Sequence, residues 1–161
     1  MENIVIVDCV RTGLAKAHRG TFNLTRSDDL VAHCINALLE RNPAVDPGAI
    51  EDVILGCGRQ VGEQSANVAR HAVALSKLPI TVPATTISRA CSSGLNSIAF
   101  AATQLASGCS EIMLAGGVES ITGLDRGNPG EHAENTILME QKPDIFMAMG
   151  NTAEVVARRY Q

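Results

Sequence analysis

The chain has 161 residues, of which 45% are hydrophobic and 19% are charged, so it can bury a core and is not a disordered tail. Its net charge is −4, without a basic run or interleaved aromatic residues, which argues against a nucleic-acid partner. No stretch approaches membrane-spanning length, and the apolar run 4–7 is too short for the core of a signal peptide.

The cysteine content points to a reducing compartment. Five cysteines are scattered along the chain without a C-x-x-C pair, which indicates neither a disulfide framework nor a zinc site. We therefore expect a cytoplasmic protein that has no membrane partner and binds no metal.

Four short apolar runs predict strands. The runs lack polar alternation, as strands do when both of their faces are covered. They comprise residues 4–8, 52–56, 84–88 and 111–116.

Helical spacing of apolar residues appears between these runs. The first predicted helix spans 27–41, with Ser27 available as its N-cap and Pro43 after its end. The second spans about 65–75 and ends before Pro79.

The third predicted helix begins at Cys91 and is rich in alanine. We expect it to be buried all round and to stop at Gly108. Alternation of strands and helices is typical of βαβ crossovers, which predicts an α/β fold with a mostly parallel sheet. Beyond Gly117 periodicity is weak, and helical composition returns only at 152–159.

Cys91 follows a predicted parallel strand and opens a helix. Ligand sites of α/β sheets gather at this end of the strands. A helix N-terminus favours the reactive thiolate, and the small residues Ser92, Ser93 and Gly94 leave the N–H groups of the first turn open to a developing oxyanion. A small buried hydrophobic cysteine is the alternative that these features leave open.

Five blocks of sequence carry a resemblance. Cys91 lies in ISRACSSGLNSIAF, and the others are VRTGLAKAHRG, GEQSANVARHAVALSKLP, AGGVES and AMGNTAEVVA. In this order they resemble the thiolase family along nearly the whole chain. The block around Cys91 looks like the nucleophile motif of that family, which leads into an alanine-rich helix.

The resemblance implies a two-stage acyl transfer without metal or redox cofactor. The thiolate of Cys91, with backbone N–H groups as oxyanion donors, attacks a coenzyme A thioester or 3-ketoacyl thioester and becomes acylated. A second thiol or an acetyl-CoA carbanion then takes the acyl group. The implied enzyme is an acyltransferase of fatty acid metabolism, either an acetyl-CoA acetyltransferase or a 3-ketoacyl-CoA thiolase.

Two alternatives stay open. One is another condensing enzyme of the thiolase superfamily, which shares the fold and a cysteine at the top of a helix. The other is a noncatalytic thiolase-like protein that binds acyl-CoA or lipid.

Two further catalytic motifs of the family do not occur in the chain. They are a Gly-His-Pro motif, whose histidine activates the thiolate, and a Cys-x-Gly motif, whose cysteine acts as acid and base. We therefore expect His18, His33, His71, His132 and Cys109 to be structural or solvated.

Met149 is the second candidate site residue, as a wall of the acyl pocket. Many thiolases that prefer acetoacetyl-CoA have His-Met-Gly here, whereas this chain has Ala148 in the histidine position. This departure favours a 3-ketoacyl-CoA thiolase of broader chain length. A core methionine is the alternative interpretation.

The resemblance also predicts the domain organisation. Residues 1–117 correspond to most of the N-terminal α/β half of a thiolase-like layered fold, and 118–161 to the beginning of an inserted loop domain. The last strand of the first sheet is expected after residue 161, so this chain alone would leave a sheet edge and the helix after Cys91 uncovered.

The expected partners follow from the same resemblance. They are acyl-CoA or acetyl-CoA as substrates, the remaining C-terminal part of the same protein, and further copies in a homodimer or homotetramer. Coenzyme A takes part as a substrate, and no cofactor is expected.

Two smaller signals concern the ends of strands. The glycine-rich stretch 56–64 matches neither the Rossmann nor the Walker spacing, so we expect a loop without a phosphate site. Gly116 and Gly117 are expected to permit close backbone packing, and Glu119 to cap or pair locally.

Overall fold

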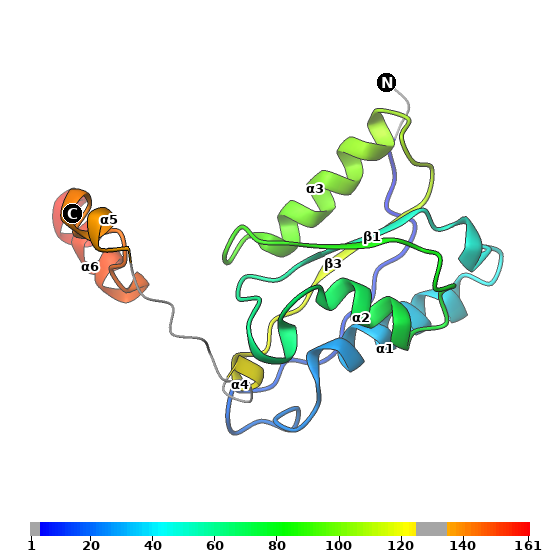
Figure 1. Cartoon of the computed structure of the whole chain (residues 1–161), viewed down its shortest axis with the longest axis horizontal. Coiled ribbons are helices and arrows are strands. Elements are labelled where there is room, and N and C mark those ends of the chain that lie inside the picture. Colours follow the sequence, from blue (N-terminus) through cyan, green and yellow to red (C-terminus); the bar gives the residue numbers. More distant parts are fainter. Residues whose placement is uncertain (1–3, 125–134) are drawn as a thin grey trace. The chain divides into compact units, whose positions relative to one another are not determined.

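The computed structural model describes residues 4–124 and 135–161 (Figure 1). The chain forms two compact units, Met1–Pro129 and Gly130–Gln161, and each is described here by itself. His132 lies outside the described residues. The division after residue 117 that the resemblance predicts stays a prediction.

The first unit is built on a parallel sheet of three strands. These are β1 (Asp52–Gly56), β2 (Ala84–Ile87) and β3 (Met113–Gly117). The order is β2-β1-β3, and Val53 of β1 lies opposite Ala84 on one side and Leu114 on the other. Among the described residues the outer edges of β2 and β3 pair with no further strand, so the predicted α/β fold is confirmed with both edges open.

Helices cover both faces of this sheet (Figure 1). They are α1 (Ser27–Arg41), α2 (Val68–Leu75) and α3 (Ser93–Ala106). On one face, Val53 and Leu55 pack against α1 and α2, whereas α3 lies on the backbone of Gly56 on the other. The main core is formed by Val31, Ile35, Ile50, Val53, Leu55, Ala69, Ala72, Val73, Leu78 and Val82.

The start of α1 differs from the prediction. Arg26 is the N-cap and Ser27 is the first helical residue, so the prediction of Ser27 as the cap is wrong. The reason is a carboxylate from another element: the backbone N–H of Ser27 donates to Oε1 of Glu63 at 3.0 Å. Asp28 and Asp29 add negative charge to the first turn, where the helix dipole favours it.

α2 begins three residues later than predicted. Asn67 is its N-cap, because Oδ1 of Asn67 accepts a hydrogen bond from the N–H of Arg70 at 3.2 Å. The amide group of Asn67 also donates to the carbonyl of Ala84 at 2.9 Å. The same side chain therefore starts the helix and ties it to β2.

The strand predicted at 4–8 is not formed. Val5, Ile6 and Val7 are 70%, 77% and 77% exposed, and the segment joins no ladder among the described residues. An apolar run becomes a strand only where a neighbour offers its backbone groups, and no described strand does so here. Instead, Asp8 ties the segment to the end of α1, accepting from Arg41 at 2.7 Å and Asn42 at 2.9 Å.

The described residues of the second unit, 135–161, form two helices, α5 (Thr136–Gln141) and α6 (Met149–Tyr160). The helix predicted at 152–159 is present and starts three residues earlier. α5 was not predicted, since its six residues are too few to show periodicity; Asn135 caps it by accepting from the N–H of Leu138 at 3.0 Å. No helix in the described parts of the chain is long and apolar enough to span a membrane.

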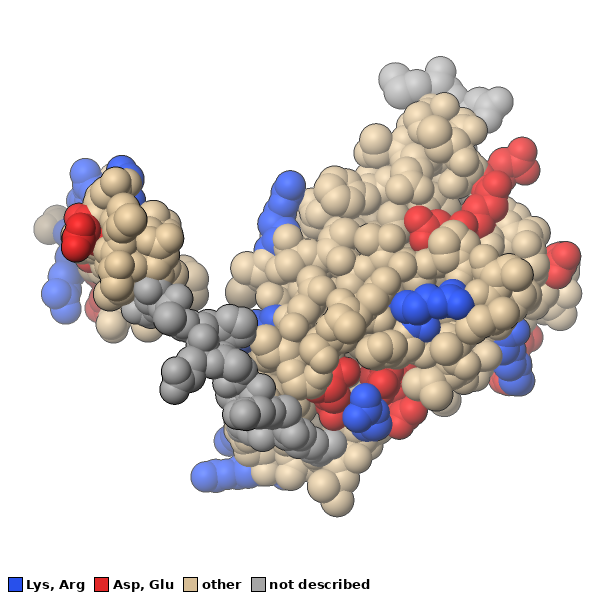
Figure 2. Space-filling view, in the orientation of Figure 1, with Lys and Arg blue, Asp and Glu red and all other residues tan. Residues whose placement is uncertain are grey.

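Charged side chains are scattered over the first unit. On the face that Figure 2 shows, basic and acidic residues are interspersed and neither sign forms a continuous surface.

The described residues of the first unit also form three short helical elements: the helix α4 (Ile121–Leu124) and the 3₁₀ turns Pro47–Ala49 and Gly62–Gln64.

Candidate active site

Cys91 lies in a tight turn between the end of β2 and the start of α3. The N–H of Ser92 donates to the carbonyl of Arg89, and that of Ser93 to the carbonyl of Ala90, both at 3.1 Å. The buried hydroxyl of Ser93 fastens the turn from inside, since it accepts from the N–H of Arg89 at 2.8 Å and donates to the Ala90 carbonyl at 2.6 Å.

Ala90 carries backbone strain directly before the cysteine. Its φ is 45°, in the left-handed region that costs a residue with a Cβ about 1–2 kcal/mol. Such a conformation persists where the surrounding structure determines it, and it is common next to functional groups.

The thiol of Cys91 is exposed to solvent. α3 begins at Ser93, so Cys91 lies two residues before the helix, and the prediction that the helix begins at Cys91 is wrong. Within the described residues, the N–H groups of Cys91, Gly94 and Leu95 donate to no acceptor. A reachable sulfur therefore lies beside free amide donors and the positive end of a 14-residue helix.

The start of α3 packs directly against the backbone of the sheet, at glycines of β1 and β3. A Cβ added to Gly56 would lie 2.2 Å from the carbonyl carbon of Ser93 and 2.4 Å from the nitrogen of Gly94. One on Gly117 would lie 3.0 Å from the carbonyl oxygen of Gly56, which confirms the predicted close backbone packing at Gly117. The same prediction is wrong for Gly116, where an added Cβ would meet only the side chain of Leu55, at 3.7 Å. Ser97 adds a hydrogen bond to the sheet, donating to the carbonyl of Gly116 at 2.6 Å.

The outer face of α3 is uncovered. Leu95 is 73% exposed, Ile98 42% and Phe100 45%. The prediction that this helix is buried all round is therefore wrong for the described residues. Its exposed face and the open sheet edges agree with the expectation that this chain alone leaves both uncovered.

The glycine-rich stretch after β1 is a loop, as predicted. It ends in a 3₁₀ turn, which was not predicted. Cys57 opens the loop and is fully buried. Burial, and secondly the charge of Glu119, raise the pKa of Cys57 to about 11, so this thiol stays protonated at neutral pH. Unlike Cys91, Cys57 is a packing residue.

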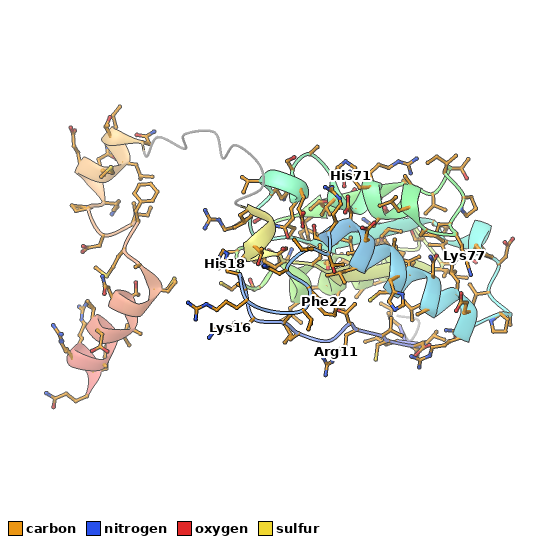
Figure 3. All side chains as sticks on the ribbon, turned by 90° about the horizontal axis from the view of Figure 1, so that it is seen from below. Arg11, Lys16, His18, Phe22, His71 and Lys77 are labelled. Atoms are coloured by element: carbon orange, nitrogen blue, oxygen red, sulfur yellow. The ribbon has the colours of Figure 1, made fainter. Side chains whose placement is uncertain are left out.

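The remaining histidines and Cys109 lie outside the turn. His33 on α1 and His71 on α2 are exposed, and Figure 3 shows His71 on that helix. The backbone N–H of His18 donates to the hydroxyl of Thr122 at 2.8 Å. Cys109 is exposed after the end of α3. No group of three or more side chains suited to a metal ion occurs in residues 4–124 and 135–161.

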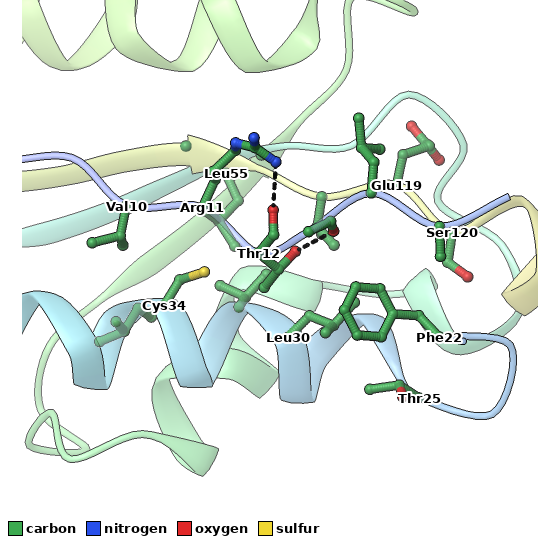
Figure 4. A pocket seen from close by; sticks show the side chains of 18 of the residues that line it. Val10, Arg11, Thr12, Phe22, Thr25, Leu30, Cys34, Leu55, Glu119 and Ser120 are labelled. Carbon is green, nitrogen blue, oxygen red and sulfur yellow. Dashed lines mark hydrogen bonds between the residues drawn. The ribbon is translucent and has the colours of Figure 1, made fainter. Parts of the chain in front are cut away.

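A cavity of about 510 Å³ lies between the N-terminal segment, α1 and β3 (Figure 4). Val10, Phe22, Leu30 and Cys34 contribute to its largely apolar lining. Burial raises the pKa of Cys34, which keeps this thiol protonated as well. Cys91 does not line this cavity, so it is separate from the nucleophile turn.

Met149 is the first residue of α6 in the second unit, where it is 71% exposed. Its predicted place in the wall of an acyl pocket stays a prediction.

The structure corrects the prediction for Glu119. Its carboxylate binds a loop about 60 residues earlier in the chain rather than a local partner. In the sequence, the only feature that could have pointed to this role of Glu119 is its position directly after a predicted strand.

Comparison with known proteins places these features in a family. Residues 4–161 match the family model "Thiolase, N-terminal domain". A 3-ketoacyl-CoA thiolase of Bacillus subtilis (strain 168) is 42% identical over 160 residues, 99% of this chain and 40% of the relative. One of Aliivibrio salmonicida (strain LFI1238) is 45% identical over 119 residues, 74% of this chain and 31% of the relative.

A solved structure agrees with the sequence relatives. The crystal structure of the Bacillus anthracis acetyl-CoA acetyltransferase superposes with a TM-score of 0.80 at 32% identity, covering 99% of this chain and 42% of that chain. The chain thus spans less than half the length of these relatives. With the motif around Cys91, the parallel sheet and a family match over nearly all its residues, this chain belongs to the thiolase family.

Proposed function

We propose that the protein containing this chain transfers acyl groups between the thiolate of Cys91 and coenzyme A thioesters. The observation that carries the proposal is the exposed thiol beside the N–H groups of Cys91, Gly94 and Leu95, which donate to no acceptor in the part of the chain that the structure describes. An attack on a thioester or ketone needs both a nucleophile and donors for the oxygen that becomes negative. The 3-ketoacyl-CoA thiolases among the relatives support the same chemistry.

In the thiolytic direction, Sγ of Cys91 attacks the C3 carbonyl of a 3-ketoacyl-CoA. The new S–C3 bond forms, and the C3 oxygen becomes an oxyanion near the free amides. When the carbonyl reforms, the C2–C3 bond breaks and its electron pair stays on C2, which takes a proton to give acetyl-CoA. The thiol of a second coenzyme A then attacks the acylated Cys91, releasing a shortened acyl-CoA and the free cysteine. Claisen condensation is the reverse sequence.

These steps need a base for the thiol proton and an acid for C2. The chain has neither a Gly-His-Pro nor a Cys-x-Gly motif that would supply them. We therefore assign the acid and base to the remaining C-terminal part of the protein, and expect the 161-residue chain alone to be inactive. Coenzyme A is a substrate in this scheme, and no metal or redox cofactor takes part.

We assign 3-ketoacyl-CoAs of broader chain length to the protein as substrates, and the cytoplasm as its location. Ala148 in place of a histidine before Met149 supports this preference, and Met149 is assigned to the acyl pocket. A homodimer or homotetramer is the proposed assembly. The exposed Leu95 and Phe100 on α3 support a covering partner, either the C-terminal part or another copy.

The test is acylation of the complete protein by acetoacetyl-CoA without free coenzyme A. Peptide mapping after an acid quench should find one acetyl group, on the peptide that contains Cys91. Cys91→Ser should abolish it, while Cys109→Ser, which removes another exposed thiol at the far end of α3, should leave it unchanged. Acylation that persists in Cys91→Ser would refute the assignment, and tight acyl-CoA binding without acylation would favour the noncatalytic alternative.

A further inference from the structure

Glu119 binds one loop through three N–H groups. It follows β3, and its carboxylate accepts from the backbone N–H of Gly58 at 2.7 Å and of Arg59 at 3.3 Å. The side-chain amide of Gln64, at the end of the same loop, donates to it at 3.1 Å. Hydrogen bonds to an ionised carboxylate are stronger than neutral ones, so this single side chain fixes both ends of the loop.

Gln64 reinforces this attachment. It is fully buried, its amide N–H also donates to the carbonyl of Arg59 at 3.0 Å, and its oxygen accepts from the N–H of Ser120 at 2.5 Å. Glu119 and Ser120 thus hold the loop from one side, in the region shown in Figure 4. Gln64 is the buried member of this network, and both its amide N–H group and its oxygen have partners, which restricts the network to one arrangement.

The loop also packs against the nucleophile turn, at Gly58. A Cβ added to Gly58 would lie 2.8 Å from Oε2 of Glu119 and 3.1 Å from the carbonyl oxygen of Ala90. The hydroxyl of Ser88 donates to the carbonyl of Gly58 at 3.2 Å. The missing Cβ of Gly58 therefore lets the carboxylate of Glu119 and the carbonyl of the strained Ala90 both pack directly against the loop.

We propose that Glu119 is a positioning residue for Cys91. Ser93 holds the turn from inside, and the loop fixed by Glu119 supports it from outside, at Ala90. The left-handed conformation of Ala90 needs such support, and it directs the thiol and the free amides. Glu119 acts through Gly58 and Ala90 and does not touch the substrate; this role rests on the proposed acyl transfer.

Glu119→Gln in the complete protein tests the proposal. An amide keeps the shape but turns an N–H group toward donors of the loop, so the support loosens. The single-turnover acylation rate of Cys91 at saturating acetoacetyl-CoA should fall about 10- to 100-fold, since a displacement of about 1 Å costs that much in rate. KM should change little. A purely structural role would lower the burst amplitude, which counts folded enzyme, and leave the rate constant unchanged.

Two controls keep the result decisive. Glu40→Gln removes an exposed carboxylate of α1 that pairs with Lys77, and it should leave the rate constant unchanged. Ser88→Ala, which removes the hydrogen bond to Gly58, should slow acylation several-fold, and it decides the case if Glu119→Gln does not fold. Unchanged rate constants in the folded variants would overturn the positioning role while acylation of Cys91 itself, absent in Cys91→Ser, still upheld the proposed function.

Discussion

The contact between Gly56 and α3 makes a quantitative prediction. Gly56→Ala places a methyl group 2.2–2.4 Å from backbone atoms of Ser93 and Gly94, and backbone cannot turn aside as a side chain does. Ordinary contacts between carbon atoms need about 3.5 Å, so the start of α3 has to retreat by about 1 Å. Overpacking typically costs about 1–3 kcal/mol, and we expect the upper end, about 3 kcal/mol.

The retreat should be visible in two assays. Thermal unfolding followed by circular dichroism measures the loss of stability, and single-turnover acylation measures the displacement of Cys91, which moves with the helix. We expect a rate about 100-fold lower, since the nucleophile shifts by about 1 Å.

Gly116→Ala is the matched control in the neighbouring strand. A Cβ there would meet only Cδ2 of Leu55, at an ordinary 3.7 Å, so its stability should stay within about 0.5 kcal/mol of wild type. If Gly56→Ala behaves like Gly116→Ala in both assays, the reasoning about the backbone contact is refuted.

Two further predictions concern titratable groups. Burial raises the pKa of Asp28, but the hydrogen bond and charge of Arg26, 2.8 Å away, outweigh this and hold it below its ordinary value. Its contribution is therefore present above the unfolded pKa of about 3.9 and lost as the pH falls through the lower folded pKa, so Asp28→Asn should cost about 1–2 kcal/mol at pH 7 and progressively less as the pH falls below about 3.9; a loss by thermal unfolding that does not shrink as the pH falls would contradict this. Because its pKa is raised to about 11, Cys57 should resist iodoacetamide at pH 8 in the folded protein, while the exposed Cys9 and Cys109 react; peptide mapping that finds Cys57 labelled as fast as Cys109 would contradict this.

Much of the fold is encoded locally and could be predicted from the sequence. β1 has the predicted bounds because its apolar run is covered on both faces. α1 also has the predicted bounds, since its stripe of apolar residues ends at Pro43. Cys91 could be placed at the carboxyl end of a parallel strand before a helix from order and spacing alone.

The errors arise where the outcome depends on distant partners. Residues 4–8 have the composition of a strand, but a strand needs a neighbouring backbone, which periodicity does not report. The N-terminus of α1 depends on Glu63, 36 residues away, and not on the local Ser27. The role of Glu119 likewise depends on Gly58, 61 residues away, so no spacing rule finds it.

The uncovered face of α3 has a consequence for biosynthesis. The relatives are more than twice as long as this chain, and the domain that this chain matches is the N-terminal domain of the family, which leaves the ribosome first. Because translation adds about 5–20 residues per second, the apolar surface around Leu95 and Phe100 stays exposed for many seconds before the rest of the polypeptide is made. Chaperone capture of the nascent thiolase should concentrate on this helix.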